Sequence, residues 1–179
     1  PGLFFRVVRF LFLMGVAAMF RILAGTYYWF PKMFGRMMSE TLVKWHFALT
    51  FIGVYATFMP MHWLGLAGNV RRYSSFPSDY MQGSLTLHRF ITFSALFLGA
   101  AQLIFLVNLL WSRLRGPAAP DNPWEATSLE WSTTSPPPFD NFGGRHPVVS
   151  HGPNEYGVAG LRGDYIMQTD PPVARAEGA

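Results

Sequence analysis

Three apolar stretches, each long enough to cross a lipid bilayer as a helix, constrain the fold of this chain more than any other feature. They run from about residue 7 to 30, from 43 to 66 and from 85 to 111. A helix needs about 20 residues to cross the hydrocarbon core of a membrane, because each residue adds about 1.5 Å along the helix axis. The sequence therefore predicts an all-α membrane protein with three transmembrane helices.

The composition changes abruptly after the third stretch, where most of the chain's 14 prolines gather. Proline has no backbone N–H and interrupts regular hydrogen bonding, so a regular helix or strand is not expected there. We therefore predict a three-helix transmembrane region over residues 1–116 and an extended, largely irregular Pro-rich tail over residues 117–179. Three aromatic side chains in this tail are the predicted anchors by which it docks onto a protein partner: Trp124, Trp131 and Phe139.

Charge and cysteine content exclude several classes of function. The net charge of +4 comes from scattered arginines, with lysine only at positions 32 and 44, so no basic stripe indicates a nucleic-acid partner. The absence of cysteine excludes disulfides, thiolate metal sites and cysteine nucleophiles. No arrangement of Ser, His and Asp or of paired carboxylates has a spacing typical of catalysis. We predict no catalytic residue and no metal site.

Basic residues near the ends of the apolar stretches predict the orientation in the membrane, because short loops rich in Lys and Arg stay in the cytoplasm. The bias is weak. One predicted side of the membrane has five basic residues, Lys32, Arg36, Lys44, Arg113 and Arg115. The opposite side has four, Arg6, Arg71, Arg72 and Arg89. The bias places the loop between the first two stretches and the tail in the cytoplasm. We expect the protein to lie in a bacterial inner membrane.

Arginine and glycine within the stretches indicate where neighbours pack. Arg9 and Arg21 lie in the first stretch, and an arginine at the centre of a bilayer costs roughly 2.5 to 3.5 kcal/mol on insertion scales. We predict that both face a protein partner, as ion-pair members or donors to backbone carbonyls; binding of a cofactor carboxylate is the alternative. The patches around Gly15, Gly25 and Gly99 are predicted to allow close helix contact.

Several motifs resemble one known family. Residues 26–38 read TYYWFPKMFGRMM, which resembles the turn between two late transmembrane helices in subunit I of haem-copper cytochrome oxidases. Two further segments, KWHFALTFIG at 44–53 and FMPMHWLGLAG at 58–68, look like the eleventh helix of that subunit. The tail segments NPWEATSLEW, SPPPF and GPNEY resemble its cytoplasmic end. The resemblance covers most of residues 12–156 and implies the same orientation as the charge bias.

The chain departs from this family where the family binds haem. The resemblance implies a His-Phe-His triplet whose histidines hold two haem irons, whereas Arg9-Phe10-Leu11 stands here. Arginine stays protonated and leucine has no donor atom, so neither can replace an imidazole. The resemblance also implies that the copper ligands lie on earlier helices, which are not represented. We predict no directly bound cofactor, with haem or bacteriochlorophyll in the surrounding complex.

Three histidines and two arginines are the remaining candidates for cofactor binding. His46 and His62 match family histidines that do not ligate haem, so we predict structural hydrogen bonds for both. The family does not explain His88, which makes it the candidate ligand of a haem or a chlorophyll-type pigment. Arg71 and Arg72 match residues that pair with haem propionates, which implies binding of carboxylates or lipid phosphates.

Three functions are consistent with these features. The first is a non-catalytic accessory subunit, derived from an oxidase fragment, that packs against other subunits and lipids of a respiratory or photosynthetic electron-transfer complex. The second is the C-terminal piece of a split cytochrome c oxidase subunit I that takes part in oxygen reduction. The third is an assembly or translocation factor that docks through its tail.

Overall fold

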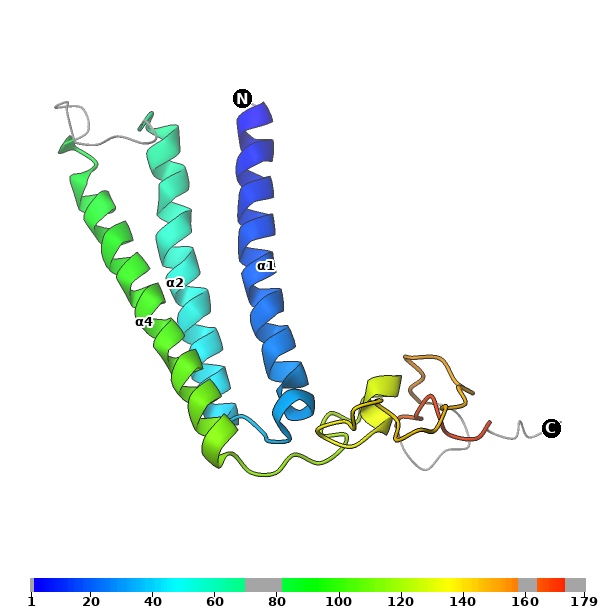
Figure 1. Ribbon diagram of the computed structural model, residues 1–179. Coiled ribbons are helices and arrows are strands. Elements are labelled where there is room, and N and C mark those ends of the chain that lie inside the picture. The colour runs from blue at the N-terminus through cyan, green and yellow to red at the C-terminus, as the bar shows by residue number, and fades with distance from the viewer. Residues whose placement is uncertain (1, 70–81, 158–163, 173–179) are drawn as a thin grey trace. The chain divides into compact units, whose positions relative to one another are not determined.

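The computed structural model describes residues 2–69, 82–157 and 164–172, with side chains from Met14 onward. Every regular element in these ranges is helical, as predicted: α1 (Gly2–Phe34), α2 (Glu40–Leu66), α4 (Leu85–Arg115) and a short 3-10 helix, η1 (Leu129–Ser132) (Figure 1).

The chain divides into two compact units that interleave along the sequence. The helical unit consists of Pro1–Tyr27 and Ser39–Trp111, and the tail unit consists of Tyr28–Met38 and Ser112–Ala179. The last residues of α1 and the loop after it therefore belong with the tail. A single boundary between residues 116 and 117 stays a prediction.

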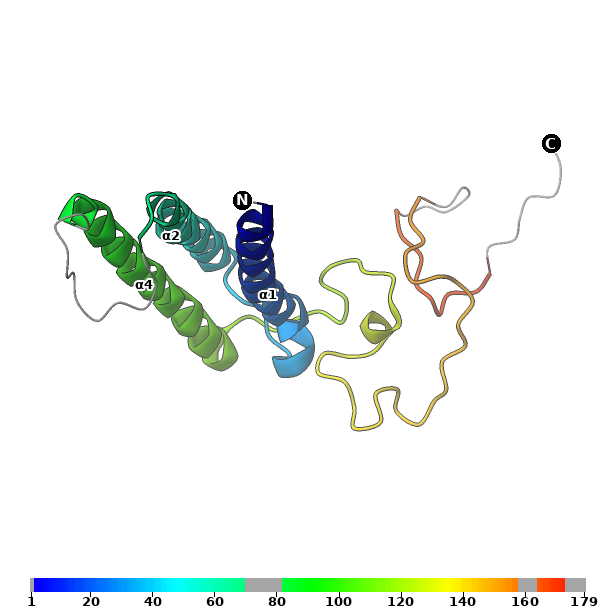
Figure 2. The same ribbon diagram turned by 90° about the horizontal axis from the view of Figure 1, so that it is seen from above.

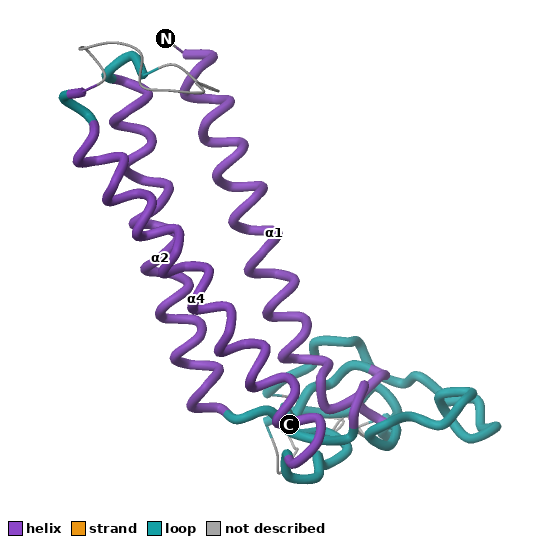
Figure 3. Tube along the Cα trace, turned by 60° about the vertical axis from the view of Figure 1, so that its left-hand side comes forward, coloured by secondary structure: helices purple, strands orange, loops and turns teal. Residues whose placement is uncertain are grey.

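In the helical unit α2 lies between α1 and α4, and consecutive helices run in opposite directions (Figures 1 and 2). The ring of Phe20 on α1 meets the rings of Phe47 and Phe51 on α2, with centroids 5.8 Å and 6.4 Å apart. Tyr27 on α1 meets Phe105 on α4 edge to face at 5.6 Å. Figure 3 shows the same three helices as long continuous coils. Aromatic contacts thus join all three helices.

One stripe of α2 is buried, and the side chains around it are exposed. The stripe recurs every three or four residues, which places its members on one face of a helix. It comprises His46, Thr50, Gly53, Val54, Thr57, Pro60 and Leu64. On α4 the buried residues Ser94, Ala101 and Asn108 are seven residues apart and again share one face. Each helix therefore turns a narrow face with small and polar residues toward its neighbours.

Gly53 on α2 lies very close to Leu98 on α4. A Cβ atom built at this position would lie 3.0 Å from the Cβ of Leu98, which is tighter than most contacts between side chains. A Cβ at Gly15 or Gly99 would meet no atom within 4 Å. Both glycines lie on exposed faces of their helices, so the described part of the chain makes no close contact there, and contact with a helix of another subunit stays a prediction.

Two of the described helices, α2 and α4, are long and apolar enough to cross a membrane. Much of their apolar surface is exposed, with Phe93 and Leu96 on α4 among the most exposed large side chains. The first predicted span lies within α1, and its crossing of the membrane stays a prediction.

In its described residues the tail unit has little regular structure beyond the ends of α1 and α4 and the short helix η1. Backbone bonds tie the residues after α1 to those after α4: the N–H of Met37 donates to Pro117 O at 2.9 Å, and that of Ala119 to Gly35 O at 3.0 Å. Gly35 has a φ of +65°, and a Cβ there would lie 2.8 Å from Pro136 Cδ. Only glycine is compatible with both the conformation and this close approach.

Candidate functional site

A buried hydrogen-bond network centred on His46 joins the three helices of the helical unit. The His46 side chain is 2% exposed. Its Nδ1 lies 2.8 Å from the hydroxyl oxygen of Tyr27 on α1, and its Nε2 lies 3.1 Å from Oε1 of Gln102 on α4. His46 itself belongs to α2, so one ring connects all three helices.

The partners of Gln102 determine the direction of each bond in the network. Its amide nitrogen donates to Thr50 Oγ1 at 3.0 Å and to Leu98 O at 3.3 Å, so its Oε1 is left to accept from His46. His46 then carries its proton on Nε2, and its Nδ1 accepts from the Tyr27 hydroxyl. Both ring nitrogens are thus engaged in hydrogen bonds to side chains of the neighbouring helices.

A second pair of hydrogen bonds joins α4 to the residue that precedes α2. Asn108 is fully buried; its amide nitrogen donates to Ser39 O at 3.2 Å, and its Oδ1 accepts the Ser39 N–H at 3.1 Å. Ser39 directly precedes α2, where the first backbone N–H groups of a helix have no partner within it. Asn108 therefore fixes where α2 begins relative to α4.

The other predicted cofactor ligands do not come together with this network. His88 is half-buried near the start of α4, and its Nε2 accepts from the amide of Asn69 at 3.4 Å. Nδ1 of His62 donates to Phe58 O at 2.9 Å on the same helix. Arg71 and Arg72 lie outside the described residues. No group of three or more His, Asp or Glu side chains in the described ranges is arranged to hold a metal ion.

The predicted partner-binding arginines lie on α1. Arg9 lies in the helix, but it precedes Met14, from which side chains are described. Arg21 is exposed on the helical unit. Partner binding by either arginine stays a prediction.

Within the tail unit, Lys32 and Trp131 form a buried anchor. Lys32 Nζ donates to Thr133 O at 2.5 Å and to Thr134 O at 3.2 Å, and it lies 5.1 Å from the centre of the Trp131 ring. Trp131 is 1% exposed and meets Tyr28 edge to face at 5.2 Å. Lys32 thus satisfies two carbonyls of the irregular segment and adds a cation–π contact.

The three aromatic residues predicted as partner anchors have different surroundings. Trp131 is buried inside the tail unit, as described above. Trp124 is partly exposed; it stacks on Tyr28 with centroids 6.1 Å apart and donates from Nε1 to Tyr28 O at 2.9 Å. Phe139 is 108% exposed, that is, entirely open to solvent. Binding of a partner by any of them stays a prediction, and Phe139 has the surface most available for it.

Comparison with known proteins places the chain in a family. The family model described as cytochrome c and quinol oxidase polypeptide I matches residues 2–101. This match covers more than half of the chain. The chain belongs to the oxidase subunit I family. The resemblance seen in the motifs is thereby confirmed.

Curated oxidase subunits extend the match into the tail. The chain is 43% identical over 171 residues to the alternative cytochrome c oxidase subunit 1 of Bradyrhizobium diazoefficiens, covering 94% of this chain and 29% of that protein. It is 41% identical over 155 residues to cytochrome c oxidase subunit 1 of Synechocystis, covering 87% and 27%. The chain thus spans less than a third of the length of these relatives. As a member of this family it is a fragment-sized oxidase subunit I homologue.

Sequence reasoning predicted structural hydrogen bonds for His46, but it missed its partners Tyr27 and Gln102. It also missed Asn108 and the contacts of Lys32. Lys32 entered only through its charge, and Tyr27 only as part of a family motif. A signal was present, because Ser94, Gln102 and Asn108 are the polar exceptions near the buried face of an otherwise apolar α4. Polar side chains inside a span usually face other helices.

Proposed function

We propose that this chain is a non-catalytic structural subunit of a respiratory haem-copper-oxidase-type complex in a bacterial inner membrane. In this role it supplies three packed helices and a cytoplasmic tail, and it binds other subunits of the complex and lipids. The observation that carries the proposal is the loss of the two imidazoles that the family resemblance implies at positions 9 and 11. His46, the best-buried histidine of the helical unit, bonds through both ring nitrogens to Tyr27 and Gln102 and serves helix packing.

The replacement removes both side-chain ligands of iron at these positions. At the positions where the family resemblance implies two haem-ligating histidines, the chain has Arg9 and Leu11. Neither side chain offers a nitrogen lone pair to iron. Haem in the assembled complex would then be held by other chains.

Exposed Arg21 supports association with other subunits. If α1 crosses the membrane, an exposed arginine near its middle faces lipid or a neighbouring protein. Contact with lipid costs roughly 2.5 to 3.5 kcal/mol on insertion scales, and a carboxylate or free carbonyls on a neighbour would remove that cost.

The second candidate is the C-terminal piece of a split subunit I that takes part in oxygen reduction. The observation that favours it is the 43% identity to an oxidase subunit over 94% of this chain, which includes the tail. The two candidates differ in whether haem binding and oxygen consumption depend on side chains of this chain.

Haem analysis of the purified complex tests the proposal. The tagged full chain is isolated with its partners, and haem per complex is measured from reduced-minus-oxidised spectra for wild type and for His46→Gln, His62→Gln and His88→Gln. We expect the same haem content and band positions in all four. Loss of one haem or a shifted band in any variant would overturn the proposal, and loss of oxygen consumption with it would favour the split oxidase. Isolation of the chain as a stable monomer without partners would also contradict a subunit role.

A further inference from the structure

Two segments near the end of the tail unit lie side by side and are joined by backbone bonds. The N–H of Ser150 donates to Gln168 O at 2.8 Å, and the N–H of Gly157 donates to Asp164 O at 2.9 Å. Between these two bonds Tyr156 and Tyr165 form an antiparallel bridge. The chain segment 164–171 therefore returns along the segment 150–157.

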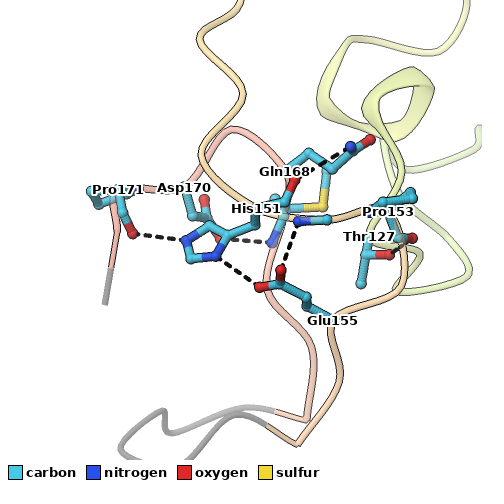
Figure 4. Close-up of polar contacts among 9 residues, drawn as sticks. Thr127, His151, Pro153, Glu155, Gln168, Asp170 and Pro171 are labelled. Carbon is cyan, nitrogen blue, oxygen red and sulfur yellow. Dashed lines mark hydrogen bonds and ion pairs between the residues drawn. The ribbon is translucent and has the colours of Figure 1, made fainter. Parts of the chain in front are cut away.

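His151 lies where these segments meet, and its side chain is 9% exposed (Figure 4). Its Nδ1 is 2.9 Å from Oε2 of Glu155, and its Nε2 is 3.1 Å from the carbonyl oxygen of Pro171. The other carboxylate oxygen of Glu155 accepts the N–H of Gly152 at 2.7 Å. Both oxygens of Glu155 are thus engaged, one of them with the imidazole.

The two partners of His151 set its protonation state. A peptide carbonyl and an ionised carboxylate only accept hydrogen bonds, so both ring nitrogens must carry a proton to make both contacts. A neutral imidazole has one N–H, and its other nitrogen would face an oxygen lone pair. We propose that His151 is a protonation-dependent latch that holds residues 164–171 against residues 150–157.

The latch secures a segment that also packs on the centre of the tail unit. The N–H of Gln168 donates to Thr127 O at 3.1 Å, and its Oε1 accepts the N–H of Leu129 at 2.8 Å. Ile166, two residues earlier, is buried. Opening the latch loosens these contacts, because they lie on the segment that His151 holds at its end.

The charges around the ring favour the closed, protonated state. The Pro171 carbonyl and the Glu155 carboxylate raise the pKa of His151 above its ordinary value of 6.5, and nearby Asp170 raises it further. The Gly152 N–H and His151 lower the pKa of Glu155 below its ordinary value of 4.5. Thr127–Leu129, the other segment packed here, has no titratable side chain.

The directions of the two pKa shifts define a pH window. The stability contributed by His151 is complete below 6.5 and is lost as pH rises through its raised pKa. The contribution of Glu155 is present above 4.5 and is lost as pH falls through its lowered pKa. The latch is therefore strongest between these values and opens toward alkaline pH.

Hydrogen exchange in the full-length chain, held in lipid nanodiscs, tests the latch. The readout is protection of the Gln168 amide, corrected for the intrinsic effect of pH on exchange. In the wild type we expect a several-fold loss of protection between about pH 6 and about pH 8.5, on either side of the histidine titration. His151→Gln should give low protection at both pH values, whereas the matched control His146→Gln, at an exposed histidine of the same unit, should behave as wild type.

A nitrogen NMR titration of His151 keeps the test decisive even if His151→Gln fails to fold. We expect both ring nitrogens to be protonated at about pH 6, a midpoint above the ordinary histidine value, and a lower midpoint in Glu155→Gln. A wild-type midpoint at or below 6.5, or Gln168 protection that is the same at both pH values, would overturn the proposal.

Discussion

The helical unit and the tail unit differ in what their central polar side chains bond to. In the helical unit side chains bond to side chains across helices, as in the chain from Tyr27 through His46 to Gln102. In the tail unit most of the bonds described above go to backbone, as those of Lys32 to Thr133 O and of Gln168 to the Leu129 N–H, with the pair His151–Glu155 as an exception. The reason is that every buried backbone N–H and C=O group needs a hydrogen-bond partner. A helix pairs these groups within itself, whereas an irregular segment needs partners from side chains or from other segments.

The interiors of the two units differ for a related reason. The helical unit buries His46, Thr50 and Asn108 and leaves large apolar side chains such as Phe93 outside. The tail unit buries the large rings of Phe30 and Trp131. Lipid solvates apolar side chains well, so helices in a membrane gain little by hiding them from it, whereas a segment in water gains by burying them.

Removing the central ring of the tail unit should have the largest effect. Trp131→Ala deletes a side chain that is 1% exposed, and such truncations typically cost about 3–5 kcal/mol. Because the chain has no cysteine, Ala126→Cys provides a unique buried reporter thiol in this unit. We expect its labelling rate to rise strongly in Trp131→Ala. The control Phe139→Ala, at a fully exposed ring, should leave the rate unchanged; an equal rise in both would contradict a self-contained tail core.

Loss of the lysine anchor should have a smaller effect on the same unit. Lys32→Met keeps the apolar stem against Trp131 but removes the two bonds to Thr133 O and Thr134 O. Hydrogen bonds from charged groups contribute about 1.5–3 kcal/mol, so thiol labelling at Ala126→Cys should quicken less than in Trp131→Ala. Lys44→Met, at an exposed lysine of α2, is the matched control. An unchanged labelling rate in Lys32→Met would show that the bonds from Lys32 to the two backbone carbonyls do not stabilise this unit.

Cutting the interhelical network should have the smallest effect. Gln102→Leu removes the acceptor of His46 and the donor to Thr50, and interhelical hydrogen bonds in membranes contribute about 0.6 kcal/mol on average and up to about 1.7. We expect a modest fall in the thermal unfolding temperature of the helical unit in nanodiscs. Gln82→Leu, at an exposed glutamine, should cause no change. An unchanged unfolding temperature in Gln102→Leu, or an equal fall in Gln82→Leu, would contradict a stabilising role for this network.

The sequence predicted the helices well because a helix depends mainly on residues that are close together in the sequence. Runs of apolar residues set where α2 and α4 lie, and their bounds agree with the predicted stretches to within a few residues. Family membership was also readable, because the motifs of residues 26–68 and of the tail are contiguous. The irregular tail could be predicted only as irregular, since its prolines exclude regular hydrogen bonding without specifying what replaces it.

Side-chain pairing was decided only by the tertiary structure. Tyr27, His46 and Gln102 are far apart in the sequence, and nothing local indicates that one ring bonds to both of the others. Trp131 and Phe139 look alike as aromatic residues in a proline-rich segment, yet one is buried and the other is fully exposed. The sequence by itself determines which backbone can form helices, because those bonds are local. The contacts among distant side chains depend on how helices and loops meet in space.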